Sequence, residues 1–387
     1  MAAPRIRSYT DGVPSPSSRP LAWSCLVLAA LAFVALSCRA SVRPAPQHGP
    51  QQPDREPPWE LDNPVRPLPA PPPGLEVDLS QAKVEVTPEK VRLGRWLFFD
   101  GRLSRDGTVS CSTCHRPEHA FSEPTAHSTG IGGREGTRKA PPILNAAFPL
   151  FDAYFWDGRA RSLVEQAKGP IVNPVEMGNT PEGVERTISA IPGYRRAFRQ
   201  AFGDDRIDID RVAEAIAAYE ATRLSGGSAY DRFAAGDENA VAPLAREGFE
   251  LFFGRARCSA CHLGPSLTDS QFHNVGIGYD PERPTLVEHG FPDPGRFAVT
   301  GAPADVGAFK TPTLRDVSRH APYMHDGSSP TLEDAVMRYV NVGSNPWLDP
   351  AMREVQVTPA DVPALVAFLR ALDGTGFEDS APRSLPR

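Results

Sequence analysis

The sequence has no long basic run, no stretch of alternating polar and apolar residues, and few cysteines. With 41 Lys and Arg against 47 Asp and Glu, its formal net charge is -6, so nucleic acid is not an expected partner. The missing period-2 pattern argues against strands in either half. Only six cysteines occur in 387 residues, and four of them fall in two short motifs. The length suits two domains with appendages.

One apolar run stands near the N-terminus. Arginines precede Leu21–Ser37, and this charged-then-apolar order is typical of a secretory signal, at the short end for a membrane span. Residues 1–37 are therefore predicted to be a signal peptide or membrane anchor, and the protein is expected to be exported to the periplasm. The residues before Cys38 are close to a lipobox. Cleavage with acylation at Cys38, a cleaved soluble form and an uncleaved anchor stay open.

Residues 38–80 are rich in proline and poor in aliphatic side chains, which predicts a linker. Ordered structure is expected to begin near Thr87, where a capping residue, Pro88 and an acidic first turn predict a helix.

The sequence C-S-T-C-H, Cys111 to His115, is the attachment pattern of a c-type haem, and C-S-A-C-H repeats it from Cys258 to His262. The alternatives are four zinc ligands or a redox dithiol. Zinc ribbons bring their cysteine pairs within roughly 15 to 20 residues, and neither alternative needs a histidine after each pair. Two covalently bound haems explain Cys111, Cys114, His115, Cys258, Cys261 and His262 together.

An apolar helical phrase precedes each motif. KVRLGRWLFF leads into the first, and LAREGFELFF leads into the second, which predicts two related haem domains in tandem, residues 81–235 and 236–387. Further helices are expected after Asp210, ending at Gly226, after Ser329 or Thr331, and after Thr358 as far as Gly374. The fold class is therefore predicted as all-α, with two tandem cytochrome c-like domains and long irregular loops.

Around these motifs the sequence resembles the bacterial dihaem cytochrome c peroxidases and their relatives in the MauG family. Six phrases carry the resemblance in order, namely LFFDGRLSRDGTVSCSTCH, APPILNAAF, FWDGRARSLVEQAKGPIVNPVEMG, ARCSACHLGP, FKTPTLRDV and PYMHDGSSPTLEDAV. They span roughly residues 90 to 345. The family implies two mostly helical domains with one haem each, and an active site between the domains near the first haem.

The resemblance also implies site residues. Glu176, in N-P-V-E-M, matches the carboxylate that moves protons during peroxide cleavage. Gln166 matches a hydrogen-bonding residue beside it, and Pro170 a wall that limits the cavity. Trp156, in FWDGRA, matches the tryptophan that relays electrons between the haems. Asp157 and Arg159 are interpreted as structural.

Two departures from the peroxidase pattern bear on the subtype. Where many members place a distal histidine, this chain has Ile131, so the first haem is predicted to be open; His127 in the same loop is the alternative ligand. Where the peroxidases place a methionine on the second haem, this chain has Tyr339, which is the MauG pattern. Met337, Met324 and Met352 are the alternatives, although Met337 would face elsewhere on a helix.

A third departure concerns calcium. Most members of the family hold a calcium ion through an asparagine, whose position here is Lys139, and through the carbonyls of His320 and Pro322. An ammonium cannot coordinate calcium. Either calcium binds through other oxygens, or the Lys139 charge takes its place, which we favour. His325 is expected to be structural.

Together these features predict a dihaem c-type peroxidase that reduces hydrogen peroxide at the N-terminal haem with electrons passed through the C-terminal haem, of the open-haem, tyrosine-ligated, MauG-like subtype. The alternatives are a MauG-like oxidase that modifies side chains of a partner protein and a dihaem electron carrier without catalysis. Expected partners are a small cytochrome c or cupredoxin, or a protein substrate, with membrane attachment through the N-terminus and a homodimer as open alternatives.

Overall fold

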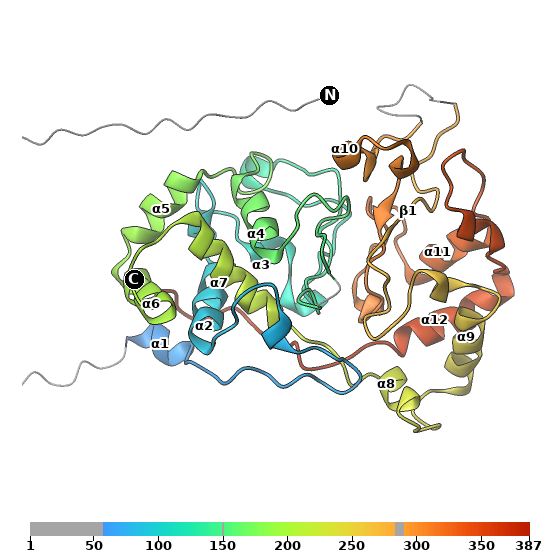
Figure 1. The fold of residues 1–387 in the computed structure, drawn as a ribbon, viewed down its shortest axis with the longest axis horizontal. Helices are drawn as coiled ribbons and strands as arrows, with labels where there is room; N and C mark the ends of the chain where they lie inside the picture. Colours follow the sequence, from blue (N-terminus) through green and yellow to red (C-terminus); the bar gives the residue numbers. More distant parts are fainter. Residues whose placement is uncertain (1–56, 149–150, 283–289) are drawn as a thin grey trace, which may run out of the picture. The chain divides into compact units, whose positions relative to one another are not determined.

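The structure is a computed structural model that describes residues 57–148, 151–282 and 290–387 (Figure 1). The predicted signal or anchor, Cys38 and the first part of the linker lie outside these residues. Within them, the chain is helical with one short antiparallel pair, β1 (Phe272–His273) beside β2 (Phe309–Lys310). The all-α fold class is confirmed. Every helix in these three segments is too short or too polar to cross a bilayer.

The α-helices begin and end as follows: α1 Pro58–Asp62, α2 Pro88–Phe99, α3 Cys111–Cys114, α4 Leu163–Val172, α5 Pro181–Ser189, α6 Pro192–Phe202, α7 Ile209–Ala221, α8 Ala229–Ala234, α9 Pro243–Phe253, α10 Phe297–Thr300, α11 Leu332–Met337 and α12 Val362–Arg370. Short 3₁₀ turns lie between them: η1 Leu79–Gln81, η2 Gly101–Leu103, η3 Pro117–His119, η4 Ile131–Gly133, η5 Cys258–Ala260, η6 Pro303–Asp305, η7 Val317–Arg319, η8 Arg338–Val340, η9 Pro350–Glu354 and η10 Pro359–Asp361.

Two helix crossings of the same kind organise the two halves of the chain. At the first, α2 packs on α7 so closely that a Cβ on Gly94 would lie 1.8 Å from the Ala215 carbonyl oxygen. At the second, α9 packs on α12, and a Cβ on Gly248 would lie 1.9 Å from the Ala364 carbonyl oxygen. Only glycine allows two backbones to approach this far. The matching crossings agree with the repeated phrase that precedes each haem motif.

Each crossing has its own hydrophobic core. The first core surrounds α2 and α7 and includes Trp96, Phe98 and Tyr194. The second surrounds α9 and α12 and includes Phe252, Leu365 and Phe368. In Figure 1 the helices of the first half are drawn in blue to green and those of the second in yellow to red. Aromatic and aliphatic burial of this extent supplies most of the driving force for folding.

The structure confirms two predicted helix starts and corrects others. Thr87 caps α2 by accepting the Lys90 N–H at 3.2 Å. Of the two starts considered for α11, Thr331 is the capping residue. The cap of α7 is Asp208, not Asp210, because the side chain of Asp208 accepts the Arg211 N–H. Asp210 lies in the first turn and forms an ion pair with Lys168.

Two predicted helix ends were too late. Helix α7 ends at Ala221, before the glycine pair at Gly226, because Thr222 turns its hydroxyl back onto the Tyr219 carbonyl. Thr358 caps the 3₁₀ turn η10, which leads into α12, and α12 ends at Arg370 rather than at Gly374.

The expectation that order begins near Thr87 was also wrong. Helix α1 precedes it, and Leu75 and Val77 are buried in a third cluster with Phe148 and Leu224. The Gly74 carbonyl accepts a hydrogen bond from Arg315 at 2.8 Å. Few aliphatic side chains are needed to hold this segment, because its backbone carbonyls are bound by side chains of the folded body.

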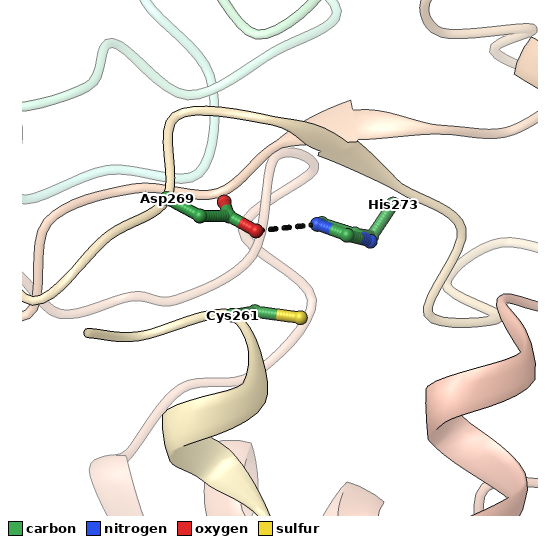
Figure 2. A group of neighbouring side chains, drawn as sticks. All are labelled: Cys261, Asp269 and His273. Atoms are coloured by element: carbon green, nitrogen blue, oxygen red, sulfur yellow. Dashed lines mark hydrogen bonds and ion pairs between the residues drawn. The ribbon is translucent and has the colours of Figure 1, made fainter. Parts of the chain in front are cut away.

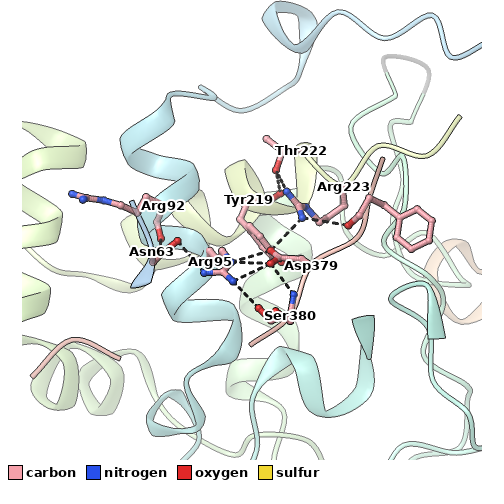
Figure 3. Close-up of polar contacts among 9 residues, drawn as sticks. Asn63, Arg92, Arg95, Tyr219, Thr222, Arg223, Asp379 and Ser380 are labelled. Carbon is pink, nitrogen blue, oxygen red and sulfur yellow. Dashed lines mark hydrogen bonds and ion pairs between the residues drawn. The ribbon is translucent and has the colours of Figure 1, made fainter. Parts of the chain in front are cut away.

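The C-terminal tail returns from the second half of the chain to the first. Phe377 enters the first core, and Asp379 binds Arg95, Arg223 and Tyr219, at 2.9, 3.2 and 2.8 Å (Figure 3). Arg95 also donates to the Asn63 side chain next to α1. One buried carboxylate therefore ties the tail to α2, α7 and the N-terminal segment.

We predict that Asp379→Ala lowers the free energy of unfolding by about 3 kcal/mol, because two mostly buried guanidinium groups lose their carboxylate. Since the neighbouring arginines hold the pKa of Asp379 below its usual range, this contribution is present above about pH 4 and is lost as the pH falls through the folded-state value. Urea unfolding of the holoprotein at pH 7 and at pH 3 measures both effects.

The matched control is Asp205→Asn, because Asp205 pairs with Arg199 on the surface. A loss below about 1 kcal/mol is expected there. Equal losses in the two variants would contradict the role assigned to Asp379.

Candidate functional site

The first candidate site is a cavity in the N-terminal half that encloses about 910 Å³ not filled by protein atoms, including space open to solvent. Helix α3 presents Cys111 and Cys114 to it, and His115 follows directly. His115 is the one histidine among the described residues that lines this cavity. Burial lowers its pKa to about 4, so the imidazole is neutral and can act as a metal ligand.

Three residues predicted from the family pattern line this same cavity. Gln166 and Pro170 come from α4, and Glu176 comes from the loop that follows it. Asn173 ends α4 and donates its side-chain N–H to Glu176 Oε1 at 2.8 Å. The structure therefore brings Glu176, Gln166 and Pro170 into one wall of the cavity that holds the first motif.

The surroundings of Glu176 have opposing effects on the pKa of its carboxyl group. Burial raises the pKa of this carboxyl above its usual range, while the Asn173 donor and the charge of Arg159 oppose the shift. A raised pKa makes the carboxylate a stronger proton acceptor than an exposed glutamate.

Ile131 and His127 do not line this cavity. Ile131 is buried in the first core, with its terminal methyl against Gly178, and its N–H donates to the Glu176 carbonyl at 2.8 Å. His127 is half-buried, and its carbonyl accepts the Thr125 hydroxyl. The loop thus supports the Glu176 backbone.

The second candidate site is a larger cavity in the C-terminal half, enclosing about 1300 Å³ that includes space open to solvent. Cys258, Cys261 and His262 line it among mostly apolar side chains. His262 Nδ1 lies 3.1 Å from the Leu267 carbonyl oxygen. This hydrogen bond orients the ring and leaves Nε2 available as a metal ligand.

Tyr339 lines the second cavity from η8. Burial raises its pKa to about 12, so a bound metal ion is needed to ionise the phenol. Met324 and Met352 line the same cavity, whereas Met337 does not and its side chain is 44% exposed. Of the four ligand candidates named from the sequence, Tyr339, Met324 and Met352 therefore line the cavity.

Trp156 lines both cavities and is the one residue that they share among the described residues. Its indole Nε1 donates to the Lys139 carbonyl at 2.8 Å, and its ring meets His325 edge-on at 6.4 Å. His325 stacks on Phe309, with ring centroids 3.5 Å apart. Nearby, Asp157 pairs with Arg159 and Arg138. The shared wall is thus held by contacts from both halves of the chain.

Lys139 is buried in this wall, with 4% of its surface exposed. Its N–H donates to the His325 carbonyl at 2.8 Å, and its ammonium donates to the Glu123 carbonyl. Burial lowers the pKa of Lys139 to about 8, and its charge in turn lowers the pKa of His320. The ammonium therefore lies in the region of His320.

The arrangement of the cysteines argues against the zinc and dithiol alternatives. The two pairs line different cavities, so the four thiols do not form one zinc site. Burial raises the pKa of Cys114 and of Cys258 to about 12, whereas a redox dithiol has a lowered pKa. None of the four thiols is in a disulfide.

One further group of possible metal ligands occurs among the described residues. Cys261, Asp269 and His273 place one ligand atom each within 4.8 Å of one another (Figure 2). His273 is held by carboxylates on both ring nitrogens, from Asp269 at 2.8 Å and from Asp349 at 2.6 Å. These contacts raise the pKa of His273 to about 11, and an imidazolium has no lone pair for a metal. The group is structural.

The donor sets fit two haem c groups. Each cavity combines two thiols, a neutral imidazole that directly follows them in the sequence, and an apolar wall large enough for a flat macrocycle. Burial lowers the pKa of both His115 and His262, and each directly follows its cysteine pair, so both neutral imidazoles can serve as proximal ligands. Fold and site together define a dihaem c-type cytochrome.

Comparisons with known proteins agree with this class. Residues 88–239 match the family described as "Di-haem cytochrome c peroxidase", and residues 245–373 match "Cytochrome c". The "Methylamine utilization protein MauG" of Methylorubrum extorquens is 42% identical, over 74% of this chain and 79% of its own. The "Cytochrome c551 peroxidase" of Nitrosomonas europaea is 40% identical, over 75% and 82%. A crystal structure of "a MauG-like protein associated with microbial copper homeostasis" superposes with TM-score 0.69 at 31% identity, over 81% of this chain and 96% of its own.

The chain belongs to the dihaem cytochrome c peroxidase family that includes MauG. It is accordingly an oxidoreductase of the peroxidase type, and the family implies haem c as its cofactor.

The first cavity also contains a buried acid that was not predicted from the sequence. Glu220 on α7 lines it and is buried. An acidic residue four positions after the apolar Ile216, on the buried face of a predicted amphipathic helix, is a signal that could have found it.

The hypothesis that the Lys139 ammonium takes the place of calcium can be tested. We predict that a calcium chelator leaves the haem spectrum and the thermal unfolding midpoint of the wild type unchanged. Lys139→Met should lower stability by about 1 to 3 kcal/mol, because the buried Glu123 carbonyl loses its donor.

Lys168→Met serves as the control, because Lys168 forms a partly exposed ion pair with Asp210. A wild-type protein that loses stability when calcium is removed would contradict replacement of the ion by Lys139.

Proposed function

We propose that this protein reduces hydrogen peroxide at the haem of its N-terminal domain, with electrons supplied through the haem of its C-terminal domain. The overall reaction joins one H₂O₂, two electrons and two protons to give two waters. The observation that carries the proposal is that Glu176 and Gln166 line the same cavity as Cys111, Cys114 and His115. A proton-transfer group beside a haem attachment site is the arrangement that peroxide cleavage requires.

Six residues would hold the two haems. Thioether bonds would form at both cysteines of each motif, and the neutral imidazoles of His115 and His262 would be the proximal ligands. When bound, the haem iron supplies the redox centre that passes electrons to peroxide. Proton transfer, positioning of the peroxide and electron transfer between the haems would be carried out by side chains of this chain.

Glu176 is the proposed proton carrier. Its carboxylate takes a proton from one oxygen of hydrogen peroxide and returns it to the other oxygen, which leaves as water. The raised pKa supports this role, because it places the carboxyl closer to neutral pH than an exposed glutamate. Asn173 holds Oε1, which leaves Oε2 to exchange the proton.

Gln166 and Pro170 are proposed to position the peroxide. The Gln166 amide can donate to one peroxide oxygen, while Pro170 limits the space available beside it. Pro170 has no N–H, so it brings no donor of its own into the cavity.

Trp156 is proposed to connect the two haems. It lines both cavities, and an indole between two redox centres shortens each electron step. Electrons would enter at the C-terminal haem from a small cytochrome c or cupredoxin and pass Trp156 on the way to the first cavity.

We further propose the open-haem, tyrosine-ligated subtype. Support comes from the first cavity, whose lining includes no second histidine among the described residues, and from Tyr339 in the second. A phenolate ligand favours higher iron oxidation states than a thioether does. Met324 and Met352 are the competing ligands.

A second candidate function follows from the same features. An oxidase that removes electrons from side chains of a partner protein would use Trp156 in the opposite direction, and Tyr339 favours it. Relatives named for methylamine utilisation lend support. Export to the periplasm, lipid attachment at Cys38 and a homodimer stay predictions, and a carrier without catalysis does not fit membership of an enzyme family.

We predict that Glu176→Gln lowers the rate of reaction with peroxide by about 10² to 10⁴, since the amide cannot carry the proton. Stopped-flow spectra of the holoprotein measure the rate, and the resting haem spectra should stay unchanged. Glu165→Gln is the matched control. This exposed glutamate lies in the first turn of α4, the helix that precedes the Glu176 loop, and its side chain accepts the Arg161 N–H. An unchanged rate in Glu176→Gln would exclude it as the proton carrier.

The reaction of the fully ferric protein with peroxide distinguishes the open-haem, tyrosine-ligated subtype from an ordinary peroxidase. One equivalent of hydrogen peroxide added to the fully ferric protein, without prior reduction, should remove the ferric EPR signals of both haems. Tyr339→Met should leave the C-terminal signal in place, because a thioether disfavours further oxidation of that iron. A requirement for one added electron before any reaction would instead indicate a hidden ligand on the first haem and an ordinary peroxidase.

A further inference from the structure

The buried face of α7 carries a carboxylate where its pattern calls for an apolar side chain. Val212, Ile216 and Glu220 are spaced four residues apart and lie on one face of the helix. Val212 and Ile216 are fully buried, and Glu220 is 3% exposed. Burying an ionisable group is costly unless a partner compensates for it.

Glu220 lines the first cavity together with Ile216 and Cys111. Its Oε2 atom is buried and has no hydrogen-bond partner among the described residues. The unpartnered oxygen therefore belongs to the wall of the cavity in which the first haem would be held.

No cation compensates for Glu220. Arg223, two residues beyond the end of α7, is directed to Asp379 and the Thr222 hydroxyl (Figure 3). On α7, Arg211 pairs with Asp204, and cations of α2 and α4, which pack against α7, also have partners elsewhere: Lys90 with Glu85 and Glu214, Arg92 with Gln200, Arg95 with Asp379, and Lys168 with Asp210. The remaining titratable groups of the cavity are His115, Arg138, Lys139, Arg159 and Glu176.

Burial alone raises the pKa of Glu220 to about 8, so the carboxyl is largely protonated at neutral pH. Two titratable groups face it, the Tyr154 phenol and the Cys111 thiol, and the charge of Glu220 raises the pKa of each. Cys111 no longer titrates once it forms a thioether. Glu220 is thus a protonated acid within the wall of a redox site.

We propose that Glu220 binds and releases the proton that accompanies one-electron reduction and oxidation of the N-terminal haem. This inference rests on the proposed attachment of that haem at Cys111 and Cys114. On reduction, one electron from the donor protein converts ferric to ferrous iron, and one proton from water converts the Glu220 carboxylate to the acid. On oxidation, the electron and the proton leave together.

The physical reason is electrostatic. Oxidation adds one positive charge to a site of low dielectric constant, and an ionised Glu220 compensates for it. The pKa of Glu220 must therefore be lower beside ferric than beside ferrous iron, so the midpoint potential falls as the pH rises between these two values. One proton per electron means a tenfold change in the equilibrium per pH unit, or about 59 mV.

The test is an EPR-monitored redox titration of the holoprotein at several pH values, which resolves the two haems. In the wild type, the potential of the N-terminal haem should fall by up to about 59 mV per pH unit around pH 8. In Glu220→Gln, which keeps the shape and stays neutral, this slope should disappear. A slope in Glu220→Gln equal to that of the wild type would overturn the proposal.

Glu214→Gln provides the control on the same helix, since Glu214 pairs with Lys90 and does not line the cavity. It should retain the wild-type slope. Haem content, measured on the same samples, distinguishes a failure of haem attachment from a failure of the role of Glu220.

A second measurement needs no variant. The redox-difference infrared spectrum of the wild type should gain the carbonyl band of a protonated carboxylic acid on reduction, and this band should shift in D₂O. Its absence near pH 8 would overturn the proposal, even if Glu220→Gln fails to fold.

Discussion

The hydrogen bonds around Lys139 are the interaction on which the rest of the site depends. The backbone of this one residue accepts the Trp156 indole N–H and donates to the His325 carbonyl, both at 2.8 Å. It therefore holds a residue common to both cavities against the second half of the chain. The Lys139 side chain is buried here too, and its ammonium donates to the Glu123 carbonyl, so the wall between the two redox sites also contains a buried amine.

The two helix crossings explain why this wall has a defined geometry. Gly94 and Gly248 let α2 approach α7, and α9 approach α12, to backbone contact. Each crossing is followed by a haem motif, so each motif is presented by a rigid pair of helices. Asp379 then ties the C-terminal tail to the first crossing through Arg95 and Arg223. The two sites are positioned by packing, and the loops between them carry the reactive side chains.

Burial determines the charge state of the reactive groups more than any ion pair does. It raises the pKa of Glu176, Glu220 and Tyr339 and lowers that of His115. In each case the neutral form is favoured, because charge is costly away from water. Neutral imidazoles suit metal binding, and a raised pKa makes a carboxylate a stronger base for proton transfer. The low dielectric constant of the cavities thus shifts the pKa of the histidine ligand and of the carboxyl groups alike.

The sequence by itself determined the class of this protein and the positions of its two C-x-x-C-H motifs. Motif spacing, the repeated helical phrase and the capping residues are local properties of the chain, so Cys111, Cys258 and the start of α2 at Thr87 could be predicted. Tertiary structure decided what depends on distant neighbours: that Asp208 rather than Asp210 caps α7, that residues 57–80 pack on the body, and that Trp156 belongs to both cavities. The lack of an ion-pair partner for Glu220 among the described residues was also decided there, because the diversion of Arg223 to Asp379 is not visible in a linear pattern.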